Sequence, residues 1–177
     1  MTVAMGEAAP DFTLPDTDGD EQQLLVGAPA TAIVFTCNHC PYALAWHDRL
    51  LDVARDYAPR GVRVVMVNPN DAERYPRDSA DASRERVRSE GGWPAPYLLD
   101  ERQEAALAYG AKTTPDVFVL DSAGILRYRG APDSDYEAPR ERALWLRDAL
   151  DAVLAGEQPV PAETEPVGCS IKWKSGG

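Results

Sequence analysis

The fold of this chain is constrained most by Cys37 and Cys40, which stand between an apolar run and a long amphipathic segment. The apolar run, residues 30–35, is rich in β-branched side chains and is typical of a buried parallel strand. From Pro41 onward, apolar residues recur every three or four positions until Gly61, which is the spacing of a helix and its stop. The sequence therefore predicts that both cysteines lie where a strand leads into a helix.

A strand-to-helix junction favours thiol chemistry, because the unpaired N–H groups and the dipole of the helix start stabilise a thiolate. We expect Cys37 at the exposed start of the helix and Cys40 one turn inside, close enough to attack a mixed disulfide on Cys37. The pair could instead be half of a zinc site, or two buried thiols that lie close by chance. No second ligand pair follows, although His39 and His47 are near, so redox chemistry is favoured and no metal is expected.

Length and charge limit the classes of protein to which the chain can belong. Its 177 residues suit one α/β domain, and its 29 acidic and 18 basic residues give a net charge of −11. This charge argues against nucleic acid and against anionic membrane surfaces as partners. Residues 1–12 lack the features of a signal peptide, and no apolar run reaches membrane-spanning length. We expect a cytoplasmic protein without a bound cofactor, in which three cysteines are better explained by cycling or metal chemistry than by a permanent disulfide.

The other elements follow from periodicity and from turn residues. A hairpin is expected within residues 9–26, and residues 30–67 read as a β-α-β unit with parallel strands. Further strands are expected at residues 97–99, 116–120 and 125–129. Further helices are expected at residues 79–90, 100–110 and 137–155, the second of them capped by Asp100 and ended by Gly110.

This order of elements resembles a thioredoxin fold, with residues 36–41 at the strand-to-helix junction and Thr114-Pro115 before the last hairpin. Residues 37–42, 68–76 and 168–173 more narrowly resemble the bacterial peroxiredoxin-like branch of the thioredoxin family, whose members are redoxins of the AhpC/TSA type. The resemblance implies an α/β fold with a central mixed sheet flanked by helices, an N-terminal β-hairpin and a C-terminal tail. It divides the chain into a thioredoxin-like domain, 1–157, and an extension, 158–177, that carries Cys169.

The resemblance also implies roles for individual residues. Cys37 would be the nucleophile and Cys40 the resolving thiol. Pro115 would be a cis proline facing them, with the Thr114 backbone free to pair with an extended substrate. His39 would lower the pKa of Cys37 if its imidazole lies near that sulfur, and it would otherwise be a solvated side chain on the first turn.

Some features depart from the family pattern or remain open. The buried acid that thioredoxins carry on the strand before the motif is replaced here by residues 31–33, which leaves proton transfer unassigned. The hydroxyl that peroxiredoxins place three residues before their reactive cysteine is also missing, because Val34 precedes Cys37 by three. Cys169 is either a free surface thiol or an additional resolving thiol.

We therefore expect a thiol-disulfide oxidoreductase that exchanges disulfides with protein or small-molecule thiols in redox homeostasis. Thioredoxin or a glutathione-type thiol could supply its electrons. The alternatives are a peroxiredoxin-like thiol peroxidase and a non-catalytic metal-binding module that uses Cys37, Cys40 and a histidine. Nucleic acid and membranes are not expected among the partners.

Overall fold

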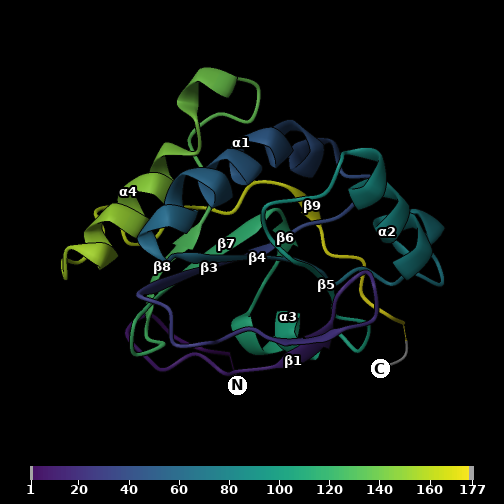
Figure 1. Ribbon diagram of the computed structural model, residues 1–177, viewed down its shortest axis with the longest axis horizontal. Helices are drawn as coiled ribbons and strands as arrows, with labels where there is room; N and C mark the ends of the chain where they lie inside the picture. Colours follow the sequence, from purple (N-terminus) through teal and green to yellow (C-terminus); the bar gives the residue numbers. More distant parts are fainter. Residues whose placement is uncertain (1, 176–177) are drawn as a thin grey trace.

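A five-stranded mixed sheet forms the centre of the computed structural model, which describes residues 2–175 (Figure 1). The strand order is β5-β4-β3-β7-β8, with β3 and β5 parallel to β4 and β7 antiparallel to both of its neighbours. The strand bounds are β3 Ala30–Phe35, β4 Arg63–Asn68, β5 Tyr97–Leu99, β7 Asp116–Asp121 and β8 Leu126–Gly130. The expected thioredoxin fold and its β-α-β unit are confirmed.

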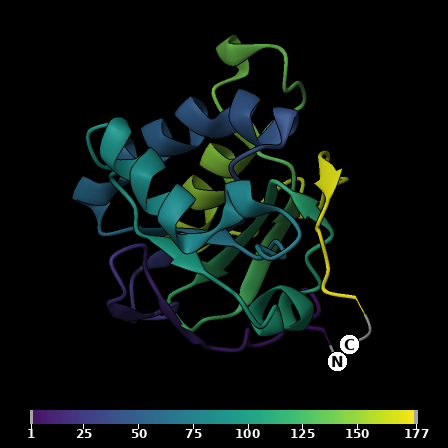
Figure 2. The same cartoon turned by 90° about the vertical axis from the view of Figure 1, so that its right-hand side faces the viewer.

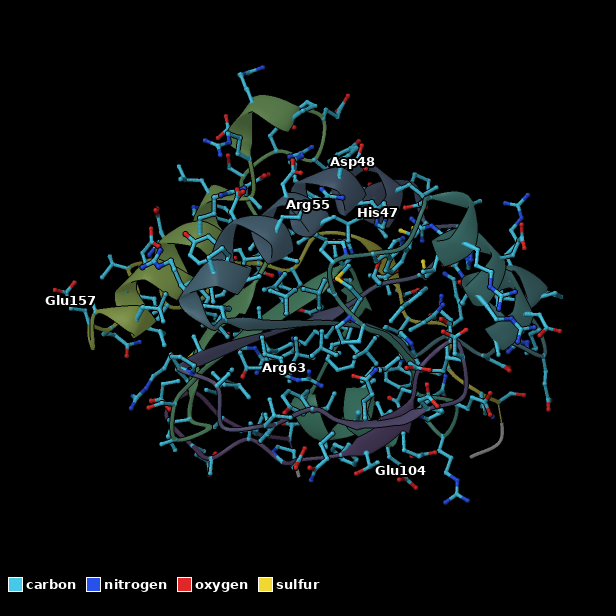
Figure 3. All side chains as sticks on the ribbon, in the orientation of Figure 1. His47, Asp48, Arg55, Arg63, Glu104 and Glu157 are labelled. Atoms are coloured by element: carbon cyan, nitrogen blue, oxygen red, sulfur yellow. The ribbon has the colours of Figure 1, made fainter. Side chains whose placement is uncertain are left out.

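Helices cover both faces of this sheet, which explains why all six residues of β3 are buried. The helix bounds are α1 Pro41–Tyr57, α2 Ala80–Ser89, α3 Glu104–Tyr109 and α4 Leu144–Leu154. Helices α1 and α4 pack on one face, where Val34 meets Trp46 and Leu150 in one apolar cluster (Figure 1). On the other face Phe35 packs with Tyr109 of α3. Charged side chains such as Glu104 and Glu157 lie on the outside (Figure 3).

Two expected helices begin later than the sequence pattern indicates. Helix α4 begins at Leu144 and not at residue 137, because residues 139–141 form a 3-10 turn and Ala143 adopts a left-handed conformation with φ 57°. Helix α3 begins at Glu104, after Gln103 in the same left-handed region. Asp100 is not the N-cap residue of α3, but its carboxylate still accepts hydrogen bonds from the free N–H groups of residues 105 and 106 in the first turn.

The short elements connect and border this framework. The expected N-terminal hairpin is present as an antiparallel pair, and two further short strands pair near the end of the sheet. The short elements are β1 Thr13–Pro15, β2 Glu21–Gln23, η1 Ala58–Arg60, η2 Pro76–Asp78, β6 Thr113–Thr114, η3 Pro139–Glu141 and β9 Cys169–Ser170. No helix within residues 2–175 combines the length and apolar character needed to cross a bilayer.

The C-terminal segment packs against the domain along much of its length (Figure 2). The N–H of Thr164 donates to the carbonyl of Arg129 at 3.0 Å, which aligns the segment with β8. Further on, β9 pairs antiparallel with β6, and Ile171 is buried. The tail is therefore held against the end of the sheet that carries the two paired cysteines.

Candidate functional site

Cys37 and Cys40 lie in the short loop between β3 and α1, as expected, but their positions differ from the expected ones in two respects. Cys40 is the N-cap residue of α1 and does not lie one turn inside the helix. Pro41 fixes this boundary, because proline lacks an N–H and suits the first helical position, and it holds the preceding residue in an extended conformation. Cys37 is also not exposed, since each of the two cysteines has only 1% of its surface accessible.

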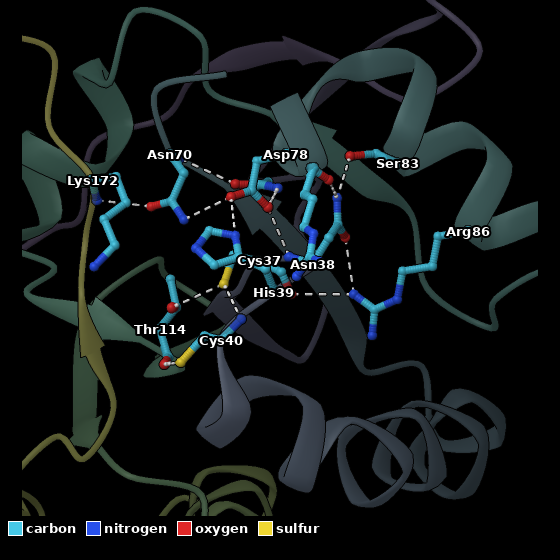
Figure 4. A network of polar contacts seen from close by, with 12 residues as sticks. Cys37, Asn38, His39, Cys40, Asn70, Asp78, Ser83, Arg86, Thr114 and Lys172 are labelled. Carbon is cyan, nitrogen blue, oxygen red and sulfur yellow. Dashed lines mark hydrogen bonds and ion pairs between the residues drawn. The ribbon is translucent and has the colours of Figure 1, made fainter. Parts of the chain in front are cut away.

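Thr114 contacts both sulfurs from the opposite side of the site (Figure 4). Its hydroxyl Oγ1 lies 3.3 Å from Cys37 Sγ, and its carbonyl oxygen lies 3.2 Å from Cys40 Sγ, which can donate to it. The backbone N–H of Cys40 donates to Cys37 Sγ at 3.3 Å. The Thr114-Pro115 bond is cis, as the resemblance implied. Residues far apart in sequence therefore surround one pair of reduced thiols.

The two thiols pack together, and their interaction separates their pKa values. It raises the pKa of Cys37 and lowers that of Cys40 to about 4. The N–H of Ala43 in the first turn of α1 also favours the Cys40 thiolate. The carbonyl of Thr114, in contrast, accepts a hydrogen bond from Cys40 only while that sulfur is protonated. Because strongly interacting groups titrate as a pair, we treat the two thiols as one unit that shares a single proton.

A buried carboxylate, Asp78, organises the loop that carries the cysteines (Figure 4). Its Oδ1 accepts hydrogen bonds from the Asn38 N–H at 2.8 Å and from Asn68 Nδ2 at 3.1 Å. Its Oδ2 accepts a hydrogen bond from Asn70 Nδ2 at 3.0 Å and lies 2.7 Å from His39 Nδ1. His39 is therefore held beside the site by an ion-pair contact, and the alternative of a freely solvated side chain is not supported.

Helix α2 also holds this loop, a role that the sequence pattern did not indicate. Arg86 donates to the Cys37 carbonyl at 3.2 Å and to Asn38 Oδ1 at 2.9 Å. The amide of Asn38 in turn donates to Ser83 Oγ at 2.9 Å. Apolar periodicity could not indicate this role of residues 79–90, because their contacts to the loop are polar and long-range.

One group of side chains among residues 2–175 has the arrangement of a metal site. Donor atoms of Cys37, His39 and Asp78 lie within 4.8 Å of one another. Thiolate, imidazole and carboxylate are all zinc ligands, but Asp78 already accepts three N–H donors in this arrangement. These three residues differ from the expected metal ligands, which were Cys37, Cys40 and a histidine, because Asp78 takes the place of Cys40. His47 pairs instead with Glu90 at 2.7 Å.

The tail contributes a third sulfur to the site. Cys169 lies opposite Thr114 in the register of β6 and β9, and it packs against Cys37 and Cys40. The expectation that the Thr114 backbone is free to pair with a substrate is therefore wrong for this conformation. Instead, the chain's own C-terminal tail pairs with Thr114 through Cys169. The sequence pattern could not indicate this pairing, because the two residues are 55 positions apart.

The fold and the site define a class of protein. A β-α-β unit carries a Cys-x-x-Cys pair at its strand-to-helix junction, opposite a cis proline that precedes an antiparallel hairpin, and this is the arrangement of a thioredoxin-fold protein. Within that class, the model of the AhpC/TSA family matches residues 5–129. The chain belongs to the AhpC/TSA family.

Comparison with individual proteins agrees with this assignment. An uncharacterized conserved protein from Geobacillus kaustophilus is 41% identical, covers 98% of this chain and 94% of its own, and superposes with a TM-score of 0.89. A hypothetical protein from Sinorhizobium meliloti 1021 is 35% identical, with 99% and 98% coverage and a TM-score of 0.91. The thiol:disulfide interchange protein DsbE of Allochromatium vinosum is 30% identical over 128 residues, 68% of this chain. The chain spans only 63% of the length of that relative.

Proposed function

We propose that this protein is a thiol-disulfide oxidoreductase in which Cys37 and Cys40 cycle between a dithiol and a disulfide. The observation that carries the proposal is the packed pair of reduced thiols at the start of α1, with Thr114 in contact with both. The similarity to a protein named for thiol:disulfide interchange supports the same chemistry. Substrates would be disulfides of proteins or small molecules.

The contacts around the pair support a two-step reduction. Transfer of the Cys37 proton to the neighbouring Cys40 thiolate leaves Cys37 as the thiolate, which the Thr114 hydroxyl and the Cys40 N–H then stabilise. This thiolate attacks a substrate disulfide, so that one S–S bond breaks, a mixed disulfide forms and one substrate thiol leaves. A protonated His39, near Cys37 and next to Asp78, would further favour the thiolate.

Cys40 completes the reaction in the second step. The departing substrate thiolate takes the proton of Cys40, and the Cys40 thiolate, which the N–H of Ala43 favours, attacks Cys37 Sγ in the mixed disulfide. The Cys37–Cys40 disulfide closes and the second substrate thiol is released. The substrate has then gained two electrons and the protein has lost two, so a dithiol donor such as thioredoxin or a glutathione-type thiol must restore the reduced pair.

Single cysteine variants test this proposal. Cys37→Ser should abolish reduction of insulin disulfides, because the attacking sulfur is missing. Cys40→Ser should retain the first step and accumulate mixed disulfides, which non-reducing gels and peptide mapping detect. Accumulation of mixed disulfides in Cys37→Ser instead would reverse the two roles, and full turnover by both variants would refute the two-cysteine cycle.

A thiol peroxidase is the second candidate function, and one contact favours it. The sequence lacks the hydroxyl that peroxiredoxins place three residues before the reactive cysteine, but the Thr114 hydroxyl lies 3.3 Å from Cys37 and could take its place. Together with membership of the AhpC/TSA family, this contact justifies a direct measurement. Consumption of hydrogen peroxide faster than disulfide exchange, with the same dithiol donor, would make the peroxidase the primary activity.

Metal content separates both enzyme proposals from a metal-binding module. We expect protein purified under reducing conditions without chelator to contain far less than one equivalent of zinc or copper. Stoichiometric metal that is lost in both Cys37→Ser and Asp78→Asn would instead favour a site formed by Cys37, His39 and Asp78.

A further inference from the structure

The two-cysteine cycle leaves one thiol at the site without a role. Cys169 packs into the same small cluster as Cys37, Cys40 and Ala43. Within this cluster, the Cys40 thiol interacts with both of the other two thiols. Cys37 and Cys40 are each 1% exposed, whereas Cys169 is partly exposed. The cluster therefore brings the sulfurs of two buried cysteines together with that of the partly exposed Cys169.

The backbone on both sides of Cys169 packs closely against β6. In the β6–β9 pair, Thr114 lies opposite Cys169 and Thr113 lies opposite Ser170. Gly168 leaves no room for a side chain, since a Cβ there would collide with the Thr114 carbonyl, with the carbonyl carbon only 2.7 Å away. The alternation of strand side chains then directs Cys169 toward Cys40 and leaves Ser170 exposed.

Residues beyond Cys169 fix the tail to the same network that holds the active-site loop. The N–H of Lys172 donates to Asn70 Oδ1 at 2.9 Å (Figure 4). The Lys172 carbonyl accepts from the Asp71 N–H at 2.8 Å and from Gln103 Nε2 at 2.9 Å. Asn70 also donates to Asp78. With Ile171 buried at 3% exposure, the segment is held on both sides of β9.

Resting on the proposed function, we propose that Cys169 is a third redox thiol that takes over the disulfide from the buried pair. The Cys169 sulfur attacks Cys40 Sγ of the Cys37–Cys40 disulfide, so that the Cys37–Cys40 bond breaks and a Cys40–Cys169 bond forms. Cys37 leaves with the electron pair of the broken bond and takes the proton that Cys169 loses. No external oxidant or reductant is consumed, because one disulfide replaces another.

This exchange has a physical consequence for the return of the protein to its reduced state. An external dithiol must approach a disulfide sulfur directly to attack it, and both sulfurs of the Cys37–Cys40 pair are buried. After the exchange, one sulfur of the disulfide belongs to the partly exposed Cys169. Burial raises the pKa of Cys169, so its proton leaves during the attack, when the departing Cys37 sulfur can accept it. The exchange would thus move the disulfide to a position where an external dithiol can reach one of its two sulfurs.

Oxidation of Cys37→Ser tests the geometry without any need for substrate turnover. Oxidised glutathione should react with one of the two remaining thiols and release one glutathione, and the other thiol should then displace the second. Mass spectrometry should show loss of two hydrogen atoms and a Cys40–Cys169 peptide pair. The double variant Cys37→Ser/Cys169→Ser should lose this disulfide and retain a glutathione adduct.

A matched control tests whether the Cys169 thiol is held next to Cys40 by the β6–β9 pairing or reaches Cys40 because the tail is flexible. Moving the thiol by one residue, with Cys37→Ser/Cys169→Ser/Ser170→Cys, places it on the opposite side of β9. We expect no internal disulfide in this variant. An internal disulfide that forms as readily as with Cys169 would show that the tail merely reaches Cys40 by diffusion and would overturn the proposal.

The wild-type protein provides the decisive measurement. After mild oxidation and alkylation, peptide mapping should find both Cys37–Cys40 and Cys40–Cys169 pairs, and Cys169→Ser should retain only the first. If Cys37–Cys40 forms and turns over insulin but Cys40–Cys169 is never found, the exchange is wrong while the proposed function stands. If Cys40–Cys169 forms but no disulfide substrate is reduced, the oxidoreductase proposal fails, and with it the role of the exchange in turnover.

Discussion

At the scale of single residues, Thr114 connects the three sulfurs of the site. Its hydroxyl faces Cys37, its carbonyl faces Cys40, and its backbone lies opposite Cys169 in a strand pair. The residue is 1% exposed, so its polar groups have little access to water and interact with these neighbours instead. A change at Thr114 should therefore act on thiol reactivity more directly than a change elsewhere in the fold.

Thr114→Val should slow the reaction of Cys37 with iodoacetamide at neutral pH, because valine keeps the shape of threonine but removes the hydroxyl near Cys37 Sγ. A hydrogen bond to a charged group contributes roughly 1.5–3 kcal/mol, so we expect a decrease of about tenfold or more. Thr114→Ser keeps the hydroxyl and serves as the control. Equal alkylation rates for the valine and serine variants would show that the hydroxyl does not stabilise the thiolate.

Asp116, two residues further on, should make stability depend on pH. It is 2% exposed and accepts the Lys112 N–H at 2.9 Å, and burial raises its pKa from the ordinary 3.8 to about 6. A carboxyl whose pKa is raised on folding stabilises the protein fully below its unfolded pKa, and this contribution is lost as the pH rises through the folded pKa. The loss should therefore occur between about pH 4 and pH 6 and amount to roughly 3 kcal/mol at most.

Asp116→Asn is the variant that isolates this group, since asparagine can still accept the Lys112 N–H but does not titrate. Urea unfolding at pH 4 and pH 7 should show a larger decrease in the free energy of unfolding for the wild type than for the variant. An identical pH dependence in both proteins would mean that Asp116 is not titrating in this range.

At the scale of elements, a buried ion pair couples α1 to the start of α4. Asp133, which is 2% exposed, accepts hydrogen bonds from Trp46 Nε1 at 2.8 Å and from Arg49 at 2.9 Å. It also accepts the N–H of Ala143 at 2.8 Å, directly before α4 begins. This one carboxylate therefore helps to set both the packing of α1 and the delayed start of α4.

Asp133→Asn should lower the melting temperature substantially, because the buried charge of Arg49 would lose its carboxylate partner. Breaking a buried pair costs roughly 3 kcal/mol or more, which corresponds to about 10 °C in a domain of this size. Asp52→Asn, which removes an exposed ion pair with Arg55 on the same helix, is the control and should change the melting temperature little. Similar melting temperatures for the two variants, measured by circular dichroism, would contradict the assignment.

At the scale of the whole molecule, the C-terminal segment closes over the end of the sheet that carries Cys37 and Cys40. The segment crosses from β8 to β6 and ends near α3, where Gln103 accepts the Lys174 N–H at 3.0 Å (Figure 2). The close approach at Gly168 makes this closure sensitive to a single methyl group.

Gly168→Ala should therefore lift β9 from β6 and increase the accessibility of Cys40. Overpacking of this kind typically costs 1–3 kcal/mol, so the rate of Cys40 alkylation should rise by about tenfold or more. Val167→Ala, at an exposed neighbouring position, is the control and should leave the rate unchanged. A rate for Gly168→Ala equal to that of the wild type would show that β9 does not restrict access to Cys40.

Local pattern determined the elements that carry the site. Residues 30–35 form β3 and residues 41–57 form α1, because apolar periodicity and a proline at the helix start act over a few positions along the chain. The same pattern placed Cys37 at the junction between them, but it placed Cys40 one turn inside the helix, whereas Cys40 is the N-cap residue. The resemblance to thioredoxins indicated the cis bond before Pro115.

Only the tertiary structure decided how the thiols are surrounded. Asp78 binds the loop from 40 residues away, the Thr114 hydroxyl reaches Cys37 across 77 residues, and β9 brings Cys169 to Cys40. These contacts leave no periodic signal in the sequence, because each depends on where the sheet and its loops place a side chain in space. For the same reason, the sequence indicated two cysteines capable of disulfide exchange but did not indicate that they are buried or that Cys169 packs against them. Both features depend on the packing of the C-terminal tail against the rest of the chain.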